Sequence, residues 1–215
     1  MNKCALLCLL VLGFPAPAAP AEEAAQWTEL KLGEAGAGFA LSPDRLLSYL
    51  GHPLKGVDFG AAAESVFVWP PSPEGSYSIA CGGAGECANC FLLRLRERTA
   101  SRLDLCRHPA DVWWAPKGNI AAIATYDEGS ALYALNVSSP VPREIAIGGI
   151  TDPAEEMLYI PSQRPVWAGA DSCLIRLAIR CSYDALRCAR FGADIRKYEL
   201  KIDFAALKAR PRRLK

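Results

Sequence analysis

Cysteines are the residues of this chain whose types and spacing point most directly to chemistry. Cys87 and Cys90 form a Cys-x-x-Cys pair, a pattern used for redox dithiols, for half of a zinc site or for haem attachment. Haem attachment needs a histidine next, and that position holds Phe91. Cys106 and His108 complete a four-ligand zinc set with the pair at plausible spacing. The remaining interpretation, structural disulfides, is the one we favour.

The first residues indicate the compartment. Lys3 is followed by an apolar stretch over residues 5–14 and small residues over 16–21, the pattern of a secretory signal peptide. A bilayer span needs about 20 apolar residues, and this stretch is too short. We expect residues 1–21 to be removed and the mature protein to be secreted or periplasmic, with no membrane span.

Seven of the nine cysteines lie beyond that signal, in one group of four and one of three: Cys81, Cys87, Cys90, Cys106, Cys173, Cys181 and Cys188. Within the first group, Cys81 is expected to meet Cys87 or Cys90 across a hairpin, which leaves another to reach Cys106. Cys173 and Cys181 stand at opposite ends of one strand, roughly 25 Å apart, so they cannot bond to each other. A Cys181–Cys188 bond closes the next loop and leaves Cys173 odd.

Acid–base candidates are few. His52 and His108 each precede a proline and are expected in surface loops. Asp152, Glu155 and Glu156 cluster three carboxylates; a cation site or an acid–base pair is the alternative to the solvated turn that we favour. Signatures of hydrolases and of phosphate-binding loops are missing from the sequence. We therefore assign no catalytic, cofactor-binding or metal-binding residue.

Tryptophans and one asparagine are candidates for surface recognition. Trp113, Trp114 and Trp167 suit a carbohydrate or peptide surface, but packing between sheets explains them better. Asn136 begins a glycosylation sequon, which matters only in a eukaryotic secretory host.

The composition narrows the possible partners and the fold class. The 24 Lys and Arg balance 23 Asp and Glu, which indicates neither a nucleic acid nor an acidic membrane as partner. About half of the residues are hydrophobic, and 17 Gly and 16 Pro favour many short strands over long helices.

Strand patterns recur along the chain. The clearest unit runs from Val112 through a Pro/Gly turn to an apolar strand at 120–124, then an acidic turn and an alternating strand at 131–137. A weaker copy covers residues 66–106, with its entry at 67–75, and its Trp69 lies 45 residues before Trp114. Alternation marks strands at 103–105, 144–147, 173–181 and 198–204. The further strand candidates are residues 27–32, 76–80, 90–96, 157–160 and 166–168. Residues 42–50 fit a capped helix as well as a turn that feeds a strand.

Residues 114–118 (Trp-Ala-Pro-Lys-Gly) and 132–137 resemble the TolB-like/WD40-like β-propeller family. The resemblance covers roughly residues 66–147 and implies blades of four short antiparallel strands. Complete propellers of this type usually have six or seven blades, and the chain has room for three to four. The predicted fold is all-β with propeller-like blades, and a β-sandwich is the alternative.

We divide the chain into a signal (1–21), an N-terminal segment with an edge strand and a short helix or degenerate blade (22–65), the blades (66–204) and a basic tail (205–215). We interpret the tail as a frayed terminus, and contact with an acidic partner is the alternative. The predicted function is that of an exported, non-enzymatic binding or scaffold protein without a cofactor. It would recognise a protein or other ligand through blade loops or an open sheet edge, and a protein partner or self-association would cover exposed edges. The alternatives are a metal-binding or thiol-redox protein that uses Cys87 and Cys90, and a hydrolase without a recognisable motif.

Overall fold

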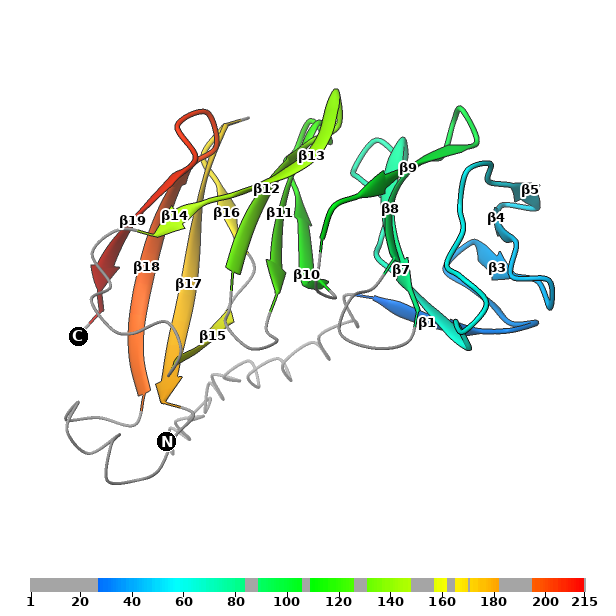
Figure 1. Cartoon of the computed structure of the whole chain (residues 1–215). Helices are drawn as coiled ribbons and strands as arrows, with labels where there is room; N and C mark the ends of the chain where they lie inside the picture. Colours follow the sequence, from blue (N-terminus) through cyan, green and yellow to red (C-terminus); the bar gives the residue numbers. More distant parts are fainter. Residues whose placement is uncertain are drawn as a thin grey trace, which may run out of the picture.

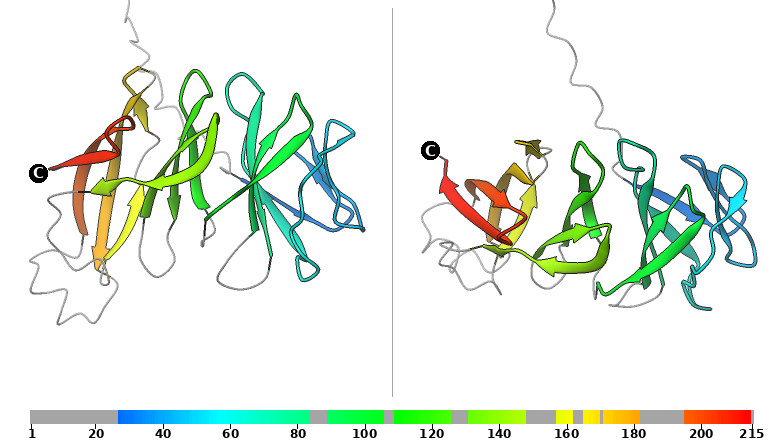
Figure 2. Two further views of the ribbon diagram at one scale, coloured as in Figure 1. Left: turned by 45° about the horizontal axis from the view of Figure 1, so that its top comes forward. Right: turned by 90° about the horizontal axis from the view of Figure 1, so that it is seen from above.

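The computed structural model describes residues 27–83, 89–105, 109–125, 131–147, 157–161, 165–169, 171–181 and 195–214. Every regular element in these ranges is a β-strand. The strands form four sheets that stand in a row, which does not close on itself within the described ranges (Figures 1 and 2). We number them sheets I to IV along the row. The predicted all-β fold with propeller-like blades is confirmed, and the same ranges hold no helix that could cross a membrane.

Each sheet is built mainly from consecutive strands. Sheet I contains β2 (Ala35–Gly36), β3 (Phe39–Leu41), β4 (Leu47–Tyr49) and β5 (His52–Pro53). Sheet II has the order β1 (Thr28–Lys31), β6 (Ser65–Val68), β7 (Tyr77–Gly82), β8 (Asn89–Arg94), β9 (Thr99–Leu103). Sheet III contains β10 (Pro109–Trp114), β11 (Ile120–Thr125), β12 (Ala131–Asn136) and β13 (Ser139–Glu144).

Sheet IV has the order β14 (Ala146–Ile147), β19 (Lys208–Arg213), β18 (Ile195–Asp203), β17 (Ser172–Cys181), β15 (Met157–Pro161). A short strand, β16 (Val166–Trp167), also pairs with β17. All these pairings are antiparallel except that of β14 with β19. Sheet II is unusual because its edge strand β1 precedes sheet I in the chain.

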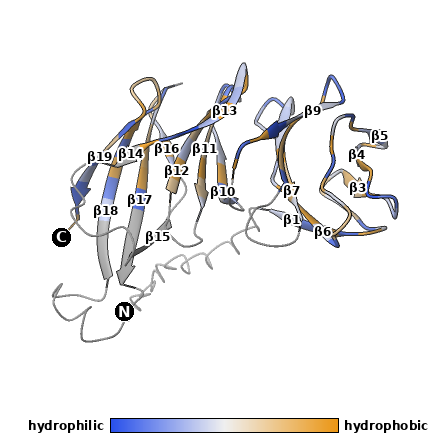
Figure 3. Ribbon diagram, in the orientation of Figure 1, coloured by the Kyte–Doolittle hydropathy of each residue, from blue (hydrophilic) through white to orange (hydrophobic). Residues whose placement is uncertain are grey.

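Three apolar layers between neighbouring sheets hold the row together. Strand β11 contributes side chains to two of these layers. Ile120 and Ala122 lie in the layer between sheets III and IV, and Ile123 lies in the layer between sheets II and III. All six β11 residues are buried, which explains their continuous apolar run. Burying a side chain such as Ile123 stabilises the fold by about 1.5–3 kcal/mol. Figure 3 shows the same apolar colouring on central strands of the sheets.

A four-residue turn of one geometry recurs in sheets I, II and III, where it joins β3 to β4, β6 to β7 and β10 to β11. It occupies residues 42–45, 72–75 and 115–118, with proline second in all three copies. The fourth residue has a positive φ, 64° at Arg45, 66° at Gly75 and 67° at Gly118, and its N–H donates to the carbonyl of the first residue at 2.7–2.9 Å. This left-handed conformation favours glycine, and two of the three copies have it.

An apolar residue follows the last strand of sheets I, II and III and enters the layer to the next sheet. These residues are Leu54, Leu105 and Ile145. Two of them are also held by a main-chain hydrogen bond to the third strand of their own sheet. The N–H of Leu54 donates to the Leu47 carbonyl at 2.9 Å, and the N–H of Ile145 donates to the Leu132 carbonyl at 2.8 Å. The chain then pairs in parallel with the last strand of the next sheet, Lys55 with Thr99 and β14 with β19. We call these two connections the latches.

Several sequence expectations need correction. Residues 42–50 form no helix: a turn and β4 follow β3, and Ser42 Oγ accepts the N–H of Leu46 at 3.0 Å. The spacing of the tryptophans gives the wrong alignment of the repeat. The turn at 115–118 is equivalent to residues 72–75, so the residue equivalent to Trp114 is Pro71 and not Trp69.

Two strand positions also differ from the expectation. The strand expected at 103–105 is β9, which ends at Leu103, and the one expected at 144–147 is divided between β13 and β14. The interpretation of 205–215 as a frayed tail is wrong, because β19 pairs with β18 over six residues.

Candidate interaction surfaces

The structure pairs Cys81 with Cys90 in a disulfide, one of the two pairings expected for Cys81. The two residues face each other directly in the β7–β8 register, and both are fully buried in the layer between sheets II and III. Because the Cys90 sulfur is bonded to Cys81, a zinc or dithiol site that uses Cys90 first requires reduction of this bond. Cys87, its partner in such a site, lies outside the described residues.

Cys173 is buried and has no disulfide partner. It lies on β17 in the layer between sheets III and IV, and burial raises the pKa of its thiol to about 12. A thiol that stays protonated at neutral pH is a poor nucleophile, so Cys173 behaves as a packing residue. The Cys181 backbone ends β17, and Cys188 lies outside the described residues.

The remaining acid–base candidates divide between described and undescribed parts of the chain. His52 is exposed in β5, as expected for a surface residue, whereas Cys106, His108 and the three carboxylates at 152–156 lie outside the described residues. The described ranges contain no group of three His, Cys, Asp or Glu side chains that could hold a metal ion.

The tryptophans pack between sheets, as expected. Trp113 is 6% exposed and faces sheet IV. Trp114 faces sheet II, where its ring stacks on Tyr77 at 6.4 Å. Trp167 stacks on Phe204 with ring centroids 5.2 Å apart. The sequon residue Asn136 is exposed at the β12–β13 turn, where its Oδ1 accepts the N–H of Ser138 at 3.0 Å.

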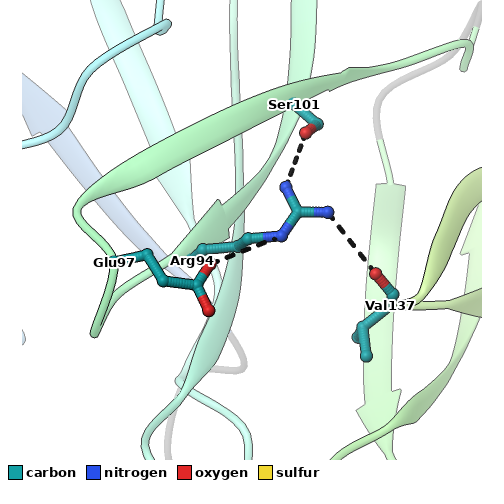
Figure 4. A network of polar contacts seen from close by, with 4 residues as sticks. All are labelled: Arg94, Glu97, Ser101 and Val137. Carbon is teal, nitrogen blue, oxygen red and sulfur yellow. Dashed lines mark hydrogen bonds and ion pairs between the residues drawn. The ribbon is translucent and has the colours of Figure 1, made fainter.

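Arg94 connects sheets II and III (Figure 4). Its Nη1 donates to Ser101 Oγ at 2.6 Å within sheet II, and its Nη2 donates to the Val137 carbonyl of sheet III at 3.5 Å. Glu97 lies 3.6 Å from its Nε. All three contacts are to groups of this chain, so the network fastens two sheets together.

The edges of the sheets differ in how well they are protected. Strand β13 carries Pro140 and Pro142 with charged neighbours, a composition that prevents pairing with another strand. The latches cover part of β9 and β19, and β1 covers the free side of β6. Strand β10 is six residues long and pairs only with β11 among the described strands. Its proline and its charged residue, Pro109 and Asp111, lie at its start beside a register shift, and the stretch from Val112 to Trp114 has no such protection.

The main chain of β10 presents hydrogen-bonding groups at this edge. Ala115 N–H donates to the Ile120 carbonyl at 2.8 Å, and bonded pairs alternate along an antiparallel ladder. The Trp113–Ala122 pair is therefore a bonded one, and the peptide groups of Val112 and Trp114 point away from β11. Nothing in the sequence distinguished β10 from a central strand, because its apolar side chains are buried on both faces like those of an inner strand.

Charged side chains gather on the face of sheet IV that points away from sheet III. Ala209 of β19 is buried toward sheet III, so its neighbours Lys208 and Arg210 lie on the opposite face. Five exposed cations share this face: Arg176, Lys201, Lys208, Arg210 and Arg212. The period-two alternation of basic residues at 208–212 was the sequence signal for both the strand and the face. We call this surface the basic face.

No protein-family profile and no curated protein sequence matches the chain. Solved structures to which the chain is similar include the following three. Hydrazine synthase of Kuenenia stuttgartiensis has 11% identity, a TM-score of 0.43 and coverage of 82% of this chain and 48% of that one. An oligogalacturonate lyase in complex with manganese has 13% identity, a TM-score of 0.41 and coverage of 71% and 44%. TolB from Acinetobacter baumannii has 12% identity, a TM-score of 0.28 and coverage of 70% and 41%.

The chain thus spans less than half the length of each of these structures. At these TM-scores, the assignment of propeller-like blades rests on the strand pairing described above.

Proposed function

We propose that this chain is an exported, non-enzymatic binding module that recognises an extended polypeptide segment by strand addition at β10. The observation that carries the proposal is the contrast between two corresponding edges. In sheet II, β1 pairs with the free side of β6 over four residues. In sheet III, the corresponding edge of β10 is open among the described strands, with the peptide groups of Val112 and Trp114 directed outward.

Strand addition obtains affinity from main-chain hydrogen bonds and specificity from alternate side chains. A strand added to β10 would extend the two layers beside sheet III. Side chains on one of its faces would lie beside Val112 and the partly exposed Trp114, and those on the other beside Trp113. We therefore expect a segment with apolar, β-branched or aromatic residues at both sets of positions.

Export is supported by the Cys81–Cys90 disulfide, since such bonds persist in oxidising compartments. The signal-like residues 1–21 lie outside the described residues and remain a prediction.

The test compares two substitutions at one position. Val112→Pro deletes the outward N–H at a site where an edge strand tolerates proline. Val112→Ala loses the same side-chain packing and keeps the N–H. Peptides selected from a random library on the wild-type chain are then measured against both variants. We expect peptides to bind Val112→Ala within about threefold of wild type and to bind Val112→Pro about tenfold or more weakly. Peptides that bind both variants equally would contradict strand addition at β10.

A further inference from the structure

The charges of this chain are distributed very unevenly. Residues 171–215 contain 12 Lys and Arg against 5 Asp and Glu, whereas residues 1–170 contain 12 against 18. The balanced total therefore conceals a net charge of +7 in the C-terminal part and −6 in the rest. Five of the described cations of this part lie on the basic face of sheet IV, at one end of the row (Figure 1).

The basic face is a flat array with regular spacing. Lys208, Arg210 and Arg212 alternate along β19, and side chains two residues apart on a strand are separated by roughly 6.8 Å. Lys201 stands opposite Arg210 on the neighbouring strand β18. Two carboxylates, Glu199 and Asp203, lie among the five cations on this face.

Glu199 shows how the face holds a carboxylate. Its two oxygens meet two arginines on either side: Oε1 accepts a hydrogen bond from Arg212 Nη2 at 2.6 Å, and Oε2 forms an ion pair with Arg176 Nε at 3.5 Å. Its side chain is 14% exposed, compared with 72% for Arg212. The surrounding cations Lys201, Lys208 and Arg210 are exposed, so an incoming carboxylate can reach them from solvent.

The layers between sheets show what this face is unsuited for. Each of the three layers within the row is apolar, whereas the basic face presents charges. A terminal repeat with a polar outer face ends a stack and does not continue it. A further blade from a second copy would cover the exposed charges of Lys201, Lys208 and Arg210 with an apolar layer, at a high cost in free energy.

We propose that the basic face binds an acidic polypeptide segment in extended conformation, with carboxylates at alternate positions. Such a segment repeats its carboxylates every 6.8 Å or so, the spacing of the cations along β19, and places an uncharged residue between them. A nucleic acid carries a phosphate on every nucleotide and would meet Glu199 and Asp203, so the interspersed carboxylates favour the peptide over a polyphosphate. This surface is separate from β10 and does not depend on the proposed strand addition.

The probe is an alternating Glu-Thr peptide of about twelve residues, long enough to span β19. The test variant is Lys201→Glu/Arg210→Glu, which leaves the Glu199 contacts in place. The matched control is Lys117→Glu/Arg143→Glu, which reverses two exposed charges of sheet III and alters the net charge equally. Circular dichroism and urea midpoints confirm folding, and Lys201→Gln/Arg210→Gln takes the place of the test variant if that one does not fold.

We expect the peptide to bind the wild type and to bind the test variant about tenfold more weakly, with a change of about twofold or less in the control. Affinity should also fall as sodium chloride rises from about 50 mM to about 500 mM. Three results would overturn the proposal. The first is an equal loss of peptide affinity in the test and control variants. The second is that a peptide with the same composition, but with its Glu and Thr in two separate blocks, binds the wild type as tightly as the alternating peptide. The third is that single-stranded DNA or anionic vesicles bind the wild type as tightly as the alternating peptide, or more tightly.

Discussion

The indole Nε1 of Trp114 donates a hydrogen bond to the main-chain oxygen of Pro70, 3.1 Å away in the neighbouring sheet. The turns of sheets II and III meet at this point, since a Cβ placed on Gly118 would lie only 3.2 Å from Ser72 Cβ. A side chain that ends the first strand of one blade thereby fixes the position of the preceding blade.

Replacing Trp114 with Phe deletes the N–H and keeps an aromatic ring to stack on Tyr77. Both hydrogen-bonding groups are near solvent, so water partly replaces the bond, and we expect a loss of about 0.5–1 kcal/mol in the free energy of unfolding in urea. The control is Trp167→Phe, because Trp167 shows no hydrogen bond to a described residue and stacks on Phe204 in a similar way. An equal loss in both variants would assign the effect to ring size alone.

Gly75 and Gly118 permit a sharper comparison between equivalent turns. Both have φ near 66°, so alanine at either position costs about 1–2 kcal/mol for the left-handed backbone. A Cβ at Gly118 would lie 3.2 Å from Ser72 Cβ, whereas one at Gly75 would meet no atom within 4 Å. We expect Gly118→Ala to lower the urea midpoint more than Gly75→Ala. Equal midpoints would mean that the two turns do not pack together.

The Cys81–Cys90 bond closes a short loop within a hairpin. Chain entropy for a loop of about ten residues predicts a stabilisation of about 2–3 kcal/mol, reduced by the constraint that β7 and β8 already impose. The double variant Cys81→Ala/Cys90→Ala should therefore unfold at lower urea concentration than the oxidised wild type. Since both sulfurs are buried, we expect a non-reducing digest of the native protein to yield a Cys81–Cys90 peptide. A Cys81–Cys87 peptide instead would contradict the pairing.

Cys173 should make stability fall at alkaline pH. Its pKa is about 12 in the folded chain and near 9 when exposed, because burial disfavours the thiolate. The folded state therefore keeps a proton that the unfolded state releases above pH 9. Below pH 9 the thiol is protonated in both states and the free energy of unfolding is unaffected. Between pH 9 and 12 the free energy of unfolding falls by about 1.4 kcal/mol for each pH unit because of this group. Urea unfolding at about pH 8 and pH 10 should show a smaller decline for Cys173→Ala than for wild type.

Ile145 tests the latch between sheets III and IV. It is 2% exposed in the layer between them, and its truncation to alanine should cost about 2–5 kcal/mol. Val141, four residues earlier on β13, is 60% exposed, and Val141→Ala should change the free energy of unfolding by about 0.5 kcal/mol or less. Similar values for the two variants would show that the latch does not contribute to packing.

The sequence predicted the strands whose apolar residues alternate or run continuously, such as β11, β12 and β17. It could not decide residues 42–50, because Ser42 and Pro43 suit both a helix start and a turn. The structure resolves this by a tertiary contact: Leu47 of β4 packs in the layer between sheets I and II.

The basic face was missed for a different reason. Lys and Arg at alternate positions look like a solvated tail unless a neighbouring strand is known, and the neighbour of β19 is the long strand β18. The open edge of β10 depends equally on distant pairing, since only the position of β1 in sheet II shows what an occupied edge looks like.

Strand β1 also has a consequence for how this architecture can be altered. Lys31 at the end of β1 stands opposite Ser65 at the start of β6, so their Cα atoms are about 5 Å apart. The chain therefore leaves sheet II after Lys31, forms all of sheet I, and returns to sheet II at Ser65, beside the point where it left. Residues 32–64 are therefore a single insertion between two paired strands. A foreign domain with adjacent termini can be joined at the same two residues, provided that it also covers the apolar side chains of sheet II that sheet I now buries, such as Phe91 and Leu93.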